Sequence, residues 1–442
     1  MDIIELLREL VSINTVNNPA KNIKPDPEAA KFIRDHLIDW GLEPELLESN
    51  GYYSVYGHIG EGKPYVMLLA HYDVVPVALE KWSYDPFKLT IVNDKAFGRG
   101  SLDDKSNVVA LMIVLRELAK HPPKCRVIYA FTGDEETGGV HGAKIIAEKL
   151  LQEDSLPKYL INADGHGMKI ITRRRKVFNF TVEVPSLTKK LRGQVKTIEF
   201  SPHYPVVQHS HAAYFVPGAD IHPLIAASIF VREKDVYVKK IDGVFMKSNV
   251  IPSKIILEYV IPDENAELVE YDENLTQLLK AVMPLTRITI PNEKFSEFGV
   301  NITPNMYMHD GKKHSIKFDV RAMVLKPGII EEKLKEALTE VLPQAKYSVL
   351  DGGGGYMYTP RDSILVQGFE KALESVGEVL RVSEGAGASD SRHFTQYGVE
   401  AVDFGPHGGN IHGDNEYVVV SSLKKLPTIY LTVIKHIESL SR

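Results

Sequence analysis

The sequence has 442 residues and a net charge of −6 at pH 7, from 52 Lys and Arg against 58 Asp and Glu. With 25% charged and 44% hydrophobic residues it has the composition of a globular protein, and its length predicts two domains. The acidic balance argues against a nucleic-acid partner.

Three further observations limit the class of protein. No apolar run approaches the length of a membrane span, so we expect no membrane partner. Asp2 and Glu5 stand where a signal peptide carries basic residues, which predicts a cytoplasmic protein. Cys125 is the only cysteine, which excludes an internal disulfide and a cysteine-based zinc site.

The first 73 residues alternate between helical and strand-like patterns. Apolar residues at helical spacing predict an amphipathic helix over 3–11, and a second helix is expected over 28–40, ending at Gly41. Residues 52–59 alternate like a strand, and the apolar run 64–70 is typical of a buried strand. Polar groups, His71 and Asp73, follow this second strand directly.

The next hundred residues continue the alternation. A turn at 97–100 precedes Asp103 and Asp104, and then come a helix (107–120), a strand (126–131), a helix (143–151) and an apolar run (159–164) that ends in Asp164. Such an alternation of strands and helices predicts a doubly wound α/β domain.

The acidic run Asp134-Glu135-Glu136 follows the strand at 126–131. Carboxylates at the end of a buried strand are costly without a cation or protons to compensate them. Ligand sites in open α/β sheets lie at these carboxyl ends. Taken alone, the run is more consistent with a solvated acidic turn before a helix.

His or acidic residues stand at the ends of elements at five separate points. These points are residues 71–73, 103–104, 134–136, 164 and 412–416. One such residue is usually just solvated, but five that converge on one sheet edge form a set of imidazole and carboxylate donors without thiolate. This set suits zinc, cobalt or manganese.

The middle of the chain has a different character. From 177 to 351, strand-like runs at 177–184 and 255–260 mix with a helical run at 329–342, which predicts an inserted α+β domain. The first domain then comprises 1–176 and 352–442, with the glycine-rich run 351–355 as the hinge. The basic run 173–176 is interpreted as a solvated loop edge.

Five motifs resemble those of the di-zinc amidohydrolases and peptidases, a family that includes aminoacylase, acetylornithine deacetylase, succinyl-diaminopimelate desuccinylase, carnosinase-type dipeptidases and carboxypeptidase S. They are Leu69-Ala-His-Tyr-Asp-Val-Val-Pro76, Gly98-Arg-Gly-Ser-Leu-Asp-Asp-Lys105, Asp134-Glu-Glu-Thr-Gly138, Gly387-Ala-Ser-Asp390 and His412-Gly-Asp-Asn-Glu-Tyr417. They occur in the family's order over nearly the whole chain. The Leu102-Asp-Asp-Lys105 variant is most similar to carboxypeptidase S.

The resemblance implies a role for each motif residue. One metal would be bound by His71 and Asp164, the other by Glu136 and His412, and Asp103 would bridge them. The two ions would be zinc, with cobalt or manganese as alternatives, and would activate one water. Asp73 would orient the imidazole of the first metal, and Glu135 would be the general base. For Asp104 no family role follows, and we expect a solvated or helix-capping acid.

The inserted domain resembles the lid and dimerisation domain of the family, which implies a homodimer. His211 matches a lid histidine that stabilises the oxyanion in the partner's site, with His209 as a rival. Arg321 and Asn249 match residues that hold the substrate's carboxylate and amide. Two alternatives remain open. The first is that the similar segment 301–304, not the segment 249–252 with Asn249, is the true match, because residues 262–300 separate motifs that usually lie close together in the family. The second is that Arg321 forms a strand-edge salt bridge.

Two classes of function follow from these residues. The first is an amide hydrolase acting on small peptides or N-acyl amino acids with a free carboxylate, and the second is a non-catalytic binding protein on the same fold. The presence of Glu135 and all five ligands argues against the second class. Asp164 stands where deacetylases and desuccinylases typically carry Glu, so we favour a dipeptidase or carboxypeptidase over an N-acyl-amino-acid deacylase.

Overall fold

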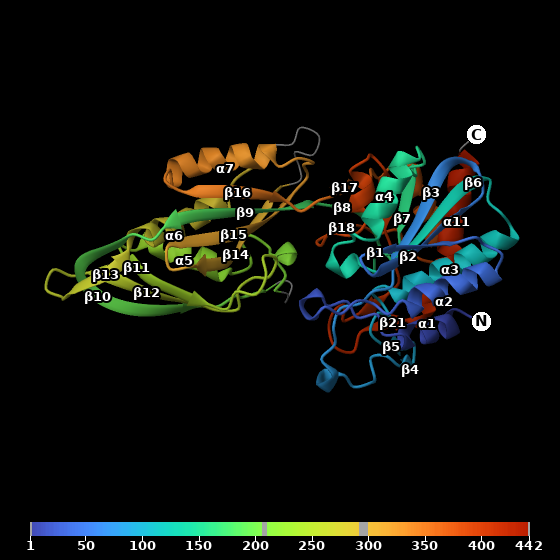
Figure 1. The fold of residues 1–442 in the computed structure, drawn as a ribbon, viewed down its shortest axis with the longest axis horizontal. Coiled ribbons are helices and arrows are strands. Elements are labelled where there is room, and N and C mark those ends of the chain that lie inside the picture. Colours follow the sequence, from blue (N-terminus) through green and yellow to red (C-terminus); the bar gives the residue numbers. More distant parts are fainter. Residues whose placement is uncertain (1, 206–209, 291–298, 441–442) are drawn as a thin grey trace. The chain divides into compact units, whose positions relative to one another are not determined.

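The structure is a computed structural model that describes residues 2–205, 210–290 and 299–440. The chain divides into two compact units. Unit 1 comprises Met1–Arg174 and Gly354–Arg442, and unit 2 comprises Arg175–Gly353. Figure 1 shows the elements of both units along the chain.

Unit 1 is built on a large mixed sheet with the order β1-β2-β6-β3-β7-β19-β8-β17, and β18 pairs with β8. Its strands are β1 (Glu45–Ser49), β2 (Tyr52–Ile59), β3 (Gly62–His71), β6 (Cys125–Thr132), β7 (Tyr159–Asn162), β8 (Ile170–Arg174), β17 (Met357–Tyr358), β18 (Val382–Gly385) and β19 (Glu400–Asp403). The four central strands, β6, β3, β7 and β19, are parallel. The pairs β1–β2, β2–β6 and β19–β8 are antiparallel.

Helices cover both faces of this sheet, as Figure 1 shows. One face packs against α1 (Ile3–Ser12), α2 (Glu28–Asp39), α3 (Lys105–Lys120), α8 (Ile364–Ser375) and α11 (Leu426–Leu440), and the other against α4 (Ala143–Gln152) and α9 (Arg392–Thr395). Strand β3 serves both cores because successive side chains point to opposite faces: Leu68 belongs to the first core, Leu69 to the second. The predicted doubly wound α/β domain is confirmed.

A small second sheet completes unit 1. It has the order β20-β21-β5-β4, all antiparallel, and the short helix α10 (Val420–Leu423) follows it. Its strands are β4 (Thr90–Val92), β5 (Lys95–Phe97), β20 (Gly408–Gly409) and β21 (Tyr417–Val419). Strand β21 pairs with β5, so the stretch around 410–416 lies beside the stretch around 98–103. This pairing could not be predicted from the sequence, because the two strands are short and far apart in the chain.

The helices of unit 1 begin and end where local chemistry predicts. Asp2 caps α1 in a capping box, since its carboxylate accepts the N–H groups of Ile4 and Glu5 while Glu5 accepts its own N–H. Helix α2 ends at the predicted Gly41, whose φ of +87° is a left-handed conformation that favours glycine.

The described residues of unit 2 form two four-stranded antiparallel sheets and three α-helices around one core. The sheets have the orders β14-β15-β9-β16 and β11-β12-β10-β13. Their elements are β9 (Lys176–Pro185), β10 (Thr188–Phe200), α5 (Pro223–Glu233), β11 (Tyr237–Gly243), β12 (Ile255–Pro262), β13 (Leu268–Asp272), α6 (Glu273–Leu285), β14 (Asn301–His309), β15 (Lys313–Ala322), α7 (Gly328–Val341) and β16 (Lys346–Asp351). The predicted α+β character is confirmed, and the segment 262–300 contributes β13 and α6 to it.

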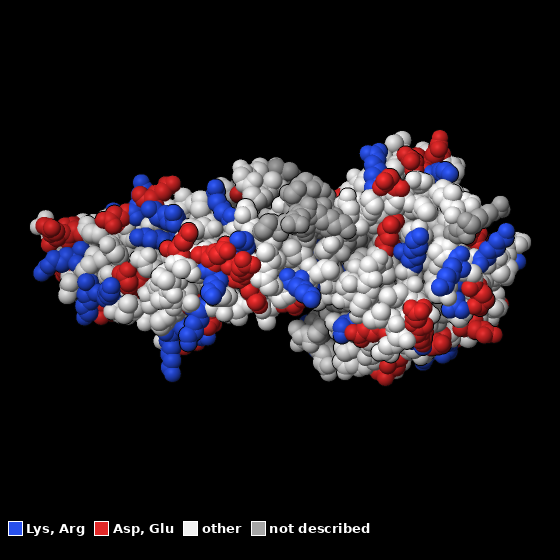
Figure 2. Space-filling view, turned by 90° about the horizontal axis from the view of Figure 1, so that it is seen from above, with Lys and Arg blue, Asp and Glu red and all other residues white. Residues whose placement is uncertain are grey.

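One prediction about the basic run 173–176 is wrong. Arg173 and Arg174 belong to β8, and Lys176 begins β9 with its side chain buried beside Asp351 at 2.8 Å. The run is therefore not a solvated loop, because strand pairing and ion pairs bury the basic groups. Elsewhere the surface is mixed: Figure 2 shows acidic and basic residues interspersed over the face it draws. None of the helices in the described ranges is long and apolar enough to cross a membrane.

A buried histidine links the stability of unit 2 to pH. His222 caps α5 by accepting the N–H of Leu224 on Nδ1, and its Nε2 lies 3.0 Å from Oδ1 of Asn305. A ring that accepts on one nitrogen and donates from the other is neutral. Burial lowers the pKa of His222 from 6.5 to about 4.

We therefore expect unit 2 to lose stability as the pH falls from 6.5 towards 4, because the unfolded histidine takes up a proton that the folded one does not. Between pH 7 and 4.5 the free energy of unfolding should fall by about 2 kcal/mol more than in His222→Asn, which keeps a capping side chain. Urea titration followed by circular dichroism measures both. Identical pH dependence in the two proteins would contradict this account of His222.

Candidate metal centre

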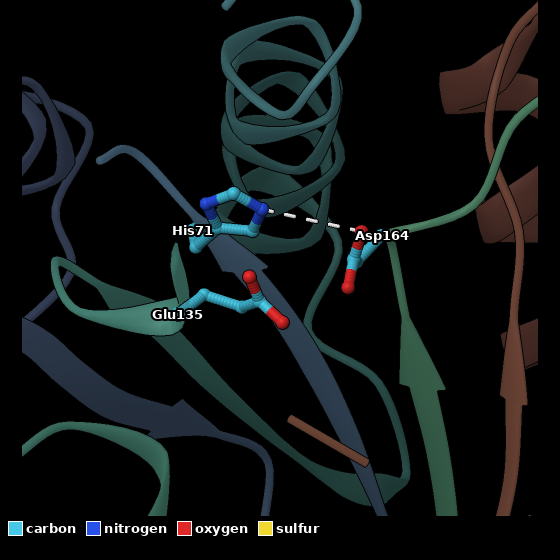
Figure 3. Close-up of side chains that lie close together, drawn as sticks. All are labelled: His71, Glu135 and Asp164. Carbon is cyan, nitrogen blue, oxygen red and sulfur yellow. Dashed lines mark ion pairs between the residues drawn. The ribbon is translucent and has the colours of Figure 1, made fainter. Parts of the chain in front are cut away.

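Parallel strands bring the predicted metal ligands to one edge of the large sheet. His71 is the last residue of β3, Glu135 and Glu136 lie in the 3-10 turn after β6 (Glu135–Thr137), and Asp164 follows β7 by two residues. Because β3 lies between β6 and β7 with all three parallel, these ends meet. Figure 3 shows the side chains of His71, Glu135 and Asp164 gathered at the ends of these strands.

Asp103 lies between the two histidines. Its Oδ1 is 3.0 Å from Nε2 of His71, and its Oδ2 is 3.0 Å from Nε2 of His412. His412 also lies 3.1 Å from Oε1 of Glu136, and His71 lies 4.0 Å from Oδ1 of Asp164. Each carboxylate oxygen of Asp103 thus faces a different group of donors, which is the arrangement that a bridging ligand needs.

Within the described part of the chain, two groups of side chains have donor atoms close enough together to hold a metal ion. The donor atoms within each group lie within 4.8 Å of one another, and the groups are His71, Glu135 and Asp164, and Asp103, Glu136 and His412. These donors are imidazole nitrogens and carboxylate oxygens, which divalent zinc, cobalt and manganese accept. The residues present therefore fit a pair of divalent cations.

The electrostatics of the site agree with this fit. Burial and the charge of Asp103 raise the pKa of Glu136 to about 7, and burial and the charge of Glu135 raise the pKa of Asp164 well above its usual range. Burial would also raise the pKa of Asp103, but hydrogen bonds with His412 and His71 hold it well below its usual range. The carboxylates thus concentrate negative charge that positive charge stabilises.

Asp73 connects the imidazole of one group to the turn that carries both glutamates. Its Oδ1 lies 3.3 Å from Nδ1 of His71, and its two oxygens accept the backbone N–H groups of Glu135 and Glu136 at 3.1 and 3.2 Å. The carboxylate is fully buried. A partner on the second ring nitrogen fixes the orientation of a ligating imidazole, so Asp73 is placed for the orienting role that the sequence predicts.

Asn17 is a positioning residue that the sequence did not reveal. Its amide donates to Oδ2 of Asp73 at 2.8 Å and to Oγ1 of Thr137 at 3.1 Å, while its oxygen accepts the hydroxyl of Tyr52. It therefore supports both Asp73 and the 3-10 turn. In the sequence Asn17 lies two residues before Pro19, outside the motifs and the predicted helices and strands, so no pattern indicated this role.

Asp104 is not the solvated acid that was one of the two predicted roles. It is buried, its oxygens accept the backbone N–H of His71 at 3.2 Å and the amide of Asn107 at 2.7 Å, and burial raises its pKa well above the usual range. It occupies the residue before α3, as a helix cap would, but its side chain bonds no backbone N–H of that helix. Asp104 instead holds the last residue of β3.

Arg174 is a second residue that sequence reasoning missed. Its Nε donates to Asp403 and its Nη1 to the carbonyl of Gly387, while Nη2 has no bonded partner among the described residues. Burial would lower its pKa, but Asp403, Asp164 and Glu135 raise it overall. A Cβ on Gly385 would lie 2.7 Å from its Cζ, so glycine there leaves room for the guanidinium. Arg174 therefore places a cation near the metal centre.

Unit 2 gathers three of the predicted lid residues in one place. Nε2 of His211 lies 3.1 Å from the amide nitrogen of Asn249, and the amide of Asn301 donates to the carbonyl of Ala212 at 3.3 Å. Asn301 in turn lies opposite Arg321 in the β14–β15 pairing. The two alternative segments, 249–252 and 301–304, thus both approach His211. The rival candidate His209 lies outside the described residues.

Two guanidinium nitrogens of Arg321 are already bonded to a carboxylate of the same strand. Its Nε and Nη2 donate to the two oxygens of Asp319 at 2.7 and 3.1 Å, and both side chains are buried. This is the ion pair that the sequence left open as an alternative, although β15 is an inner strand between β14 and β9.

The sequence of the whole chain places it among known hydrolases. Residues 67–436 match the peptidase family M20/M25/M40. The chain belongs to this family. It is 23% identical over 440 residues to the succinyl-diaminopimelate desuccinylase of Halorhodospira halophila (strain DSM 244 / SL1), with 98% of each protein covered. The resemblance drawn from the five motifs is confirmed, and the chain is a hydrolase of this family.

Solved structures share the fold over almost all of the chain. The M20 family metallo-carboxypeptidase Sso-CP2 from Sulfolobus solfataricus is 20% identical with a TM-score of 0.64, and all of both chains is covered. Aminoacylhistidine dipeptidase from Vibrio alginolyticus is 14% identical with a TM-score of 0.71, over 98% of this chain and 96% of that one. The YXEP protein of Bacillus subtilis, a dinuclear metal binding peptidase from the M20 family, is 13% identical with a TM-score of 0.54, over 98% and 96%.

Proposed function

We propose that the chain is a metal-dependent hydrolase that cleaves the amide bond of small substrates with a free carboxylate, as dipeptidases and carboxypeptidases do. The observation that carries this proposal is the position of Asp103, whose two oxygens each lie 3.0 Å from a different histidine. Glu135 belongs to the donor group of His71 and Asp164 and lies on the same turn as Glu136. A carboxylate shared by two donor groups, with a second acid adjacent, suits hydrolysis with two metal ions.

Five side chains would hold the two cations. His71 and Asp164 would bind one, Glu136 and His412 the other, and Asp103 both. The donor set favours zinc, with cobalt or manganese as alternatives. When bound, such a pair lowers the pKa of a water molecule and polarises a carbonyl oxygen.

Glu135 is the proposed general base. Asp73 holds its backbone N–H at 3.1 Å, which fixes the start of its side chain, and burial raises the pKa of its carboxyl. A raised pKa brings a carboxylate closer to the working range of a base near neutral pH. Glu135 would take one proton from the attacking water and deliver it to the nitrogen of the amide, whose bond to the carbonyl carbon then breaks.

The second candidate is an N-acyl-amino-acid deacylase. It is favoured by the desuccinylase relatives, whose sequences align with the chain from end to end. The presence of Asp rather than Glu at 164 favours the peptidase reaction, so we place the peptidase first. Both reactions break an amide bond and differ in the group on the acyl side.

Glu135→Gln tests this mechanism, because the amide cannot accept the water's proton, while the five proposed metal ligands stay in place. We expect turnover to fall by at least about a thousand-fold while bound zinc, measured by elemental analysis, stays at the parent level. Dipeptides, N-acetyl and N-succinyl amino acids, assayed with zinc- and cobalt-loaded protein, decide between the two reactions. Full activity after chelation, with no divalent ion detected, would exclude the mechanism.

Arg174 is the residue we propose for the substrate's carboxylate, because Asp164 and Glu135 of the metal centre are close enough to raise its pKa, and its Nη2 has no bond among the described residues. Arg321 is paired with Asp319 within unit 2. Lys at 174 keeps a charge beside Asp403 but removes the planar fork. Losing a charged hydrogen bond of about 1.5–3 kcal/mol should raise KM about ten- to hundred-fold.

The comparison uses Arg174→Lys, Arg321→Lys and the control Arg173→Lys, each assayed with free and amidated substrates. We expect only Arg174→Lys to raise KM for the free acid. The amidated substrate should be poor for the parent and for all three variants. If Arg321→Lys alone weakens binding of the free acid, the lid arginine predicted from the sequence holds the carboxylate instead.

A homodimer that shares its active sites is also proposed, on the basis of the resemblance. His211 belongs to unit 2 and the metal donors to unit 1. The N–H of Ala213 donates to Nδ1 of His211, and the amide nitrogen of Asn249 lies 3.1 Å from its Nε2. Nε2 would have to exchange this contact for the oxyanion and carry a proton there. This donor would act in the partner's site.

Refolding two inactive variants together tests sharing in trans. His211→Ala and Glu135→Ala should each be nearly inactive, but random pairing makes half of the dimers mixed, each with one complete site. About a quarter of parent activity should therefore return on mixing. Mixed dimers that form, as shown by differential tagging, but remain inactive would mean that His211 does not act across subunits.

A further inference from the structure

The buried carboxylate of Glu416 holds the loop that ends in Asp103. Its Oε1 accepts the backbone N–H groups of Leu102 and Asp103 at 2.8 and 2.9 Å. Its Oε2 accepts the N–H of Gly100 at 3.0 Å and Nη1 of Arg99 at 2.6 Å. With no exposed surface, Glu416 has four donors in place of water. It thus fixes the backbone from which the shared carboxylate extends.

Arg99 connects the same loop to the one that carries His412. Its Nη1 bonds Glu416, and its Nη2 donates to the carbonyl of Gly413 at 3.0 Å. The side chain is almost fully buried, so no water competes for these bonds. Arg99 and Glu416, which we call the loop clamp, therefore hold two loops that each supply a donor to the same group, Asp103 and His412.

We infer that the loop clamp positions the metal donors Asp103 and His412, so that its loss weakens most the cation held by Asp103, Glu136 and His412. That cation takes two donors from the clamped loops, whereas the other takes only the shared Asp103. The inference rests on the proposed function, since it assigns positioning residues to the metal centre of that function. Neither clamp residue is a catalytic residue, because each acts through the backbone of a donor loop.

The selectivity follows from how the remaining donors are held. His71 ends β3 in the interior of the sheet, and Asp73 and Asp104 fix it from two sides. These contacts do not involve the clamp. For His412, no side chain among the described residues fixes the ring in the way that Asp73 and Asp104 fix His71. Its side chain is about half exposed (51%), and it lies in a loop between the short strands β20 and β21. Releasing the two loops should therefore displace His412 and Asp103 while leaving His71 and Asp164 in place.

Glu416→Gln tests the clamp with little change in size. A glutamine has one oxygen and one NH₂ group in place of the two carboxylate oxygens. Its NH₂ would therefore face either the N–H groups of Leu102 and Asp103 or those of Gly100 and Arg99, which are also donors. Removing the partners that orient metal ligands typically lowers metal affinity about ten- to hundred-fold. In competition titrations with a chromophoric chelator, we expect the zinc at His412 to bind about ten- to hundred-fold more weakly than in the parent, and the other zinc to be weakened less.

Two controls accompany this variant. Ser101→Ala changes a residue of the same loop whose hydroxyl approaches only the backbone carbonyl of Glu416, at 3.4 Å, and should bind both ions as the parent does. Arg99→Lys keeps a charge beside Glu416 but cannot also reach Gly413, so it should weaken the same ion. If Glu416→Gln does not fold, Arg99→Lys decides the question. Absorption spectra of the cobalt-loaded proteins should show a larger change at one site than at the other.

The outcomes separate this inference from the function on which it rests. A parent protein that binds no divalent ion would refute the metal mechanism itself. A parent that binds two ions, together with folded Glu416→Gln and Arg99→Lys proteins that bind both with parent affinity and parent cobalt spectra, would overturn the clamp alone. Equal weakening of both ions would overturn its selectivity and show a general role in folding.

Discussion

The concentration of buried carboxylates at the ends of β3, β6 and β7 is the constraint on which the rest of unit 1 depends. Charges at such a position are costly unless opposite charge or hydrogen bonds stabilise them. The two histidines on either side of Asp103 show where positive charge belongs, with one imidazole facing each oxygen. The same arrangement makes the site suitable for two cations and, through Glu135, for moving a proton.

The protein holds this charge in place through its backbone. Asp73 binds the N–H groups of Glu135 and Glu136, and Glu416 binds those of Leu102 and Asp103. In both cases a buried carboxylate accepts a pair of adjacent amides at the turn that carries a metal donor. Fixing the backbone of a donor costs less entropy on metal binding than ordering a free loop, so these pairs prepare the site before a cation arrives.

Unit 2 holds the predicted lid residues through its own packing. Its described residues form a core of two sheets and three helices, and His211, Asn249 and Arg321 have partners within the same unit. Histidine and asparagine lie in contact there, and Asp319 holds the arginine. Arg174 lies near the carboxylates of the metal centre, and this shifts our proposal for carboxylate recognition from unit 2 to unit 1. Asp319 occupies the Nε and Nη2 edge of Arg321, so that arginine could offer a substrate only its remaining Nη hydrogens.

The sequence by itself determined the class of fold, the positions of the main helices and central strands, and the family, because hydrophobic periodicity and closely spaced motifs are local features of the chain. It also indicated that acids and histidines stand at strand ends, and the parallel order of β6, β3 and β7 explains why they meet. Only the tertiary structure decided the environments of single side chains. Asn17, Asp104, Arg174 and Glu416 have partners that are distant in sequence or belong to other elements, and neither periodicity nor spacing encodes such contacts. Their burial and pairing arise from packing between segments that come together only when the whole domain folds.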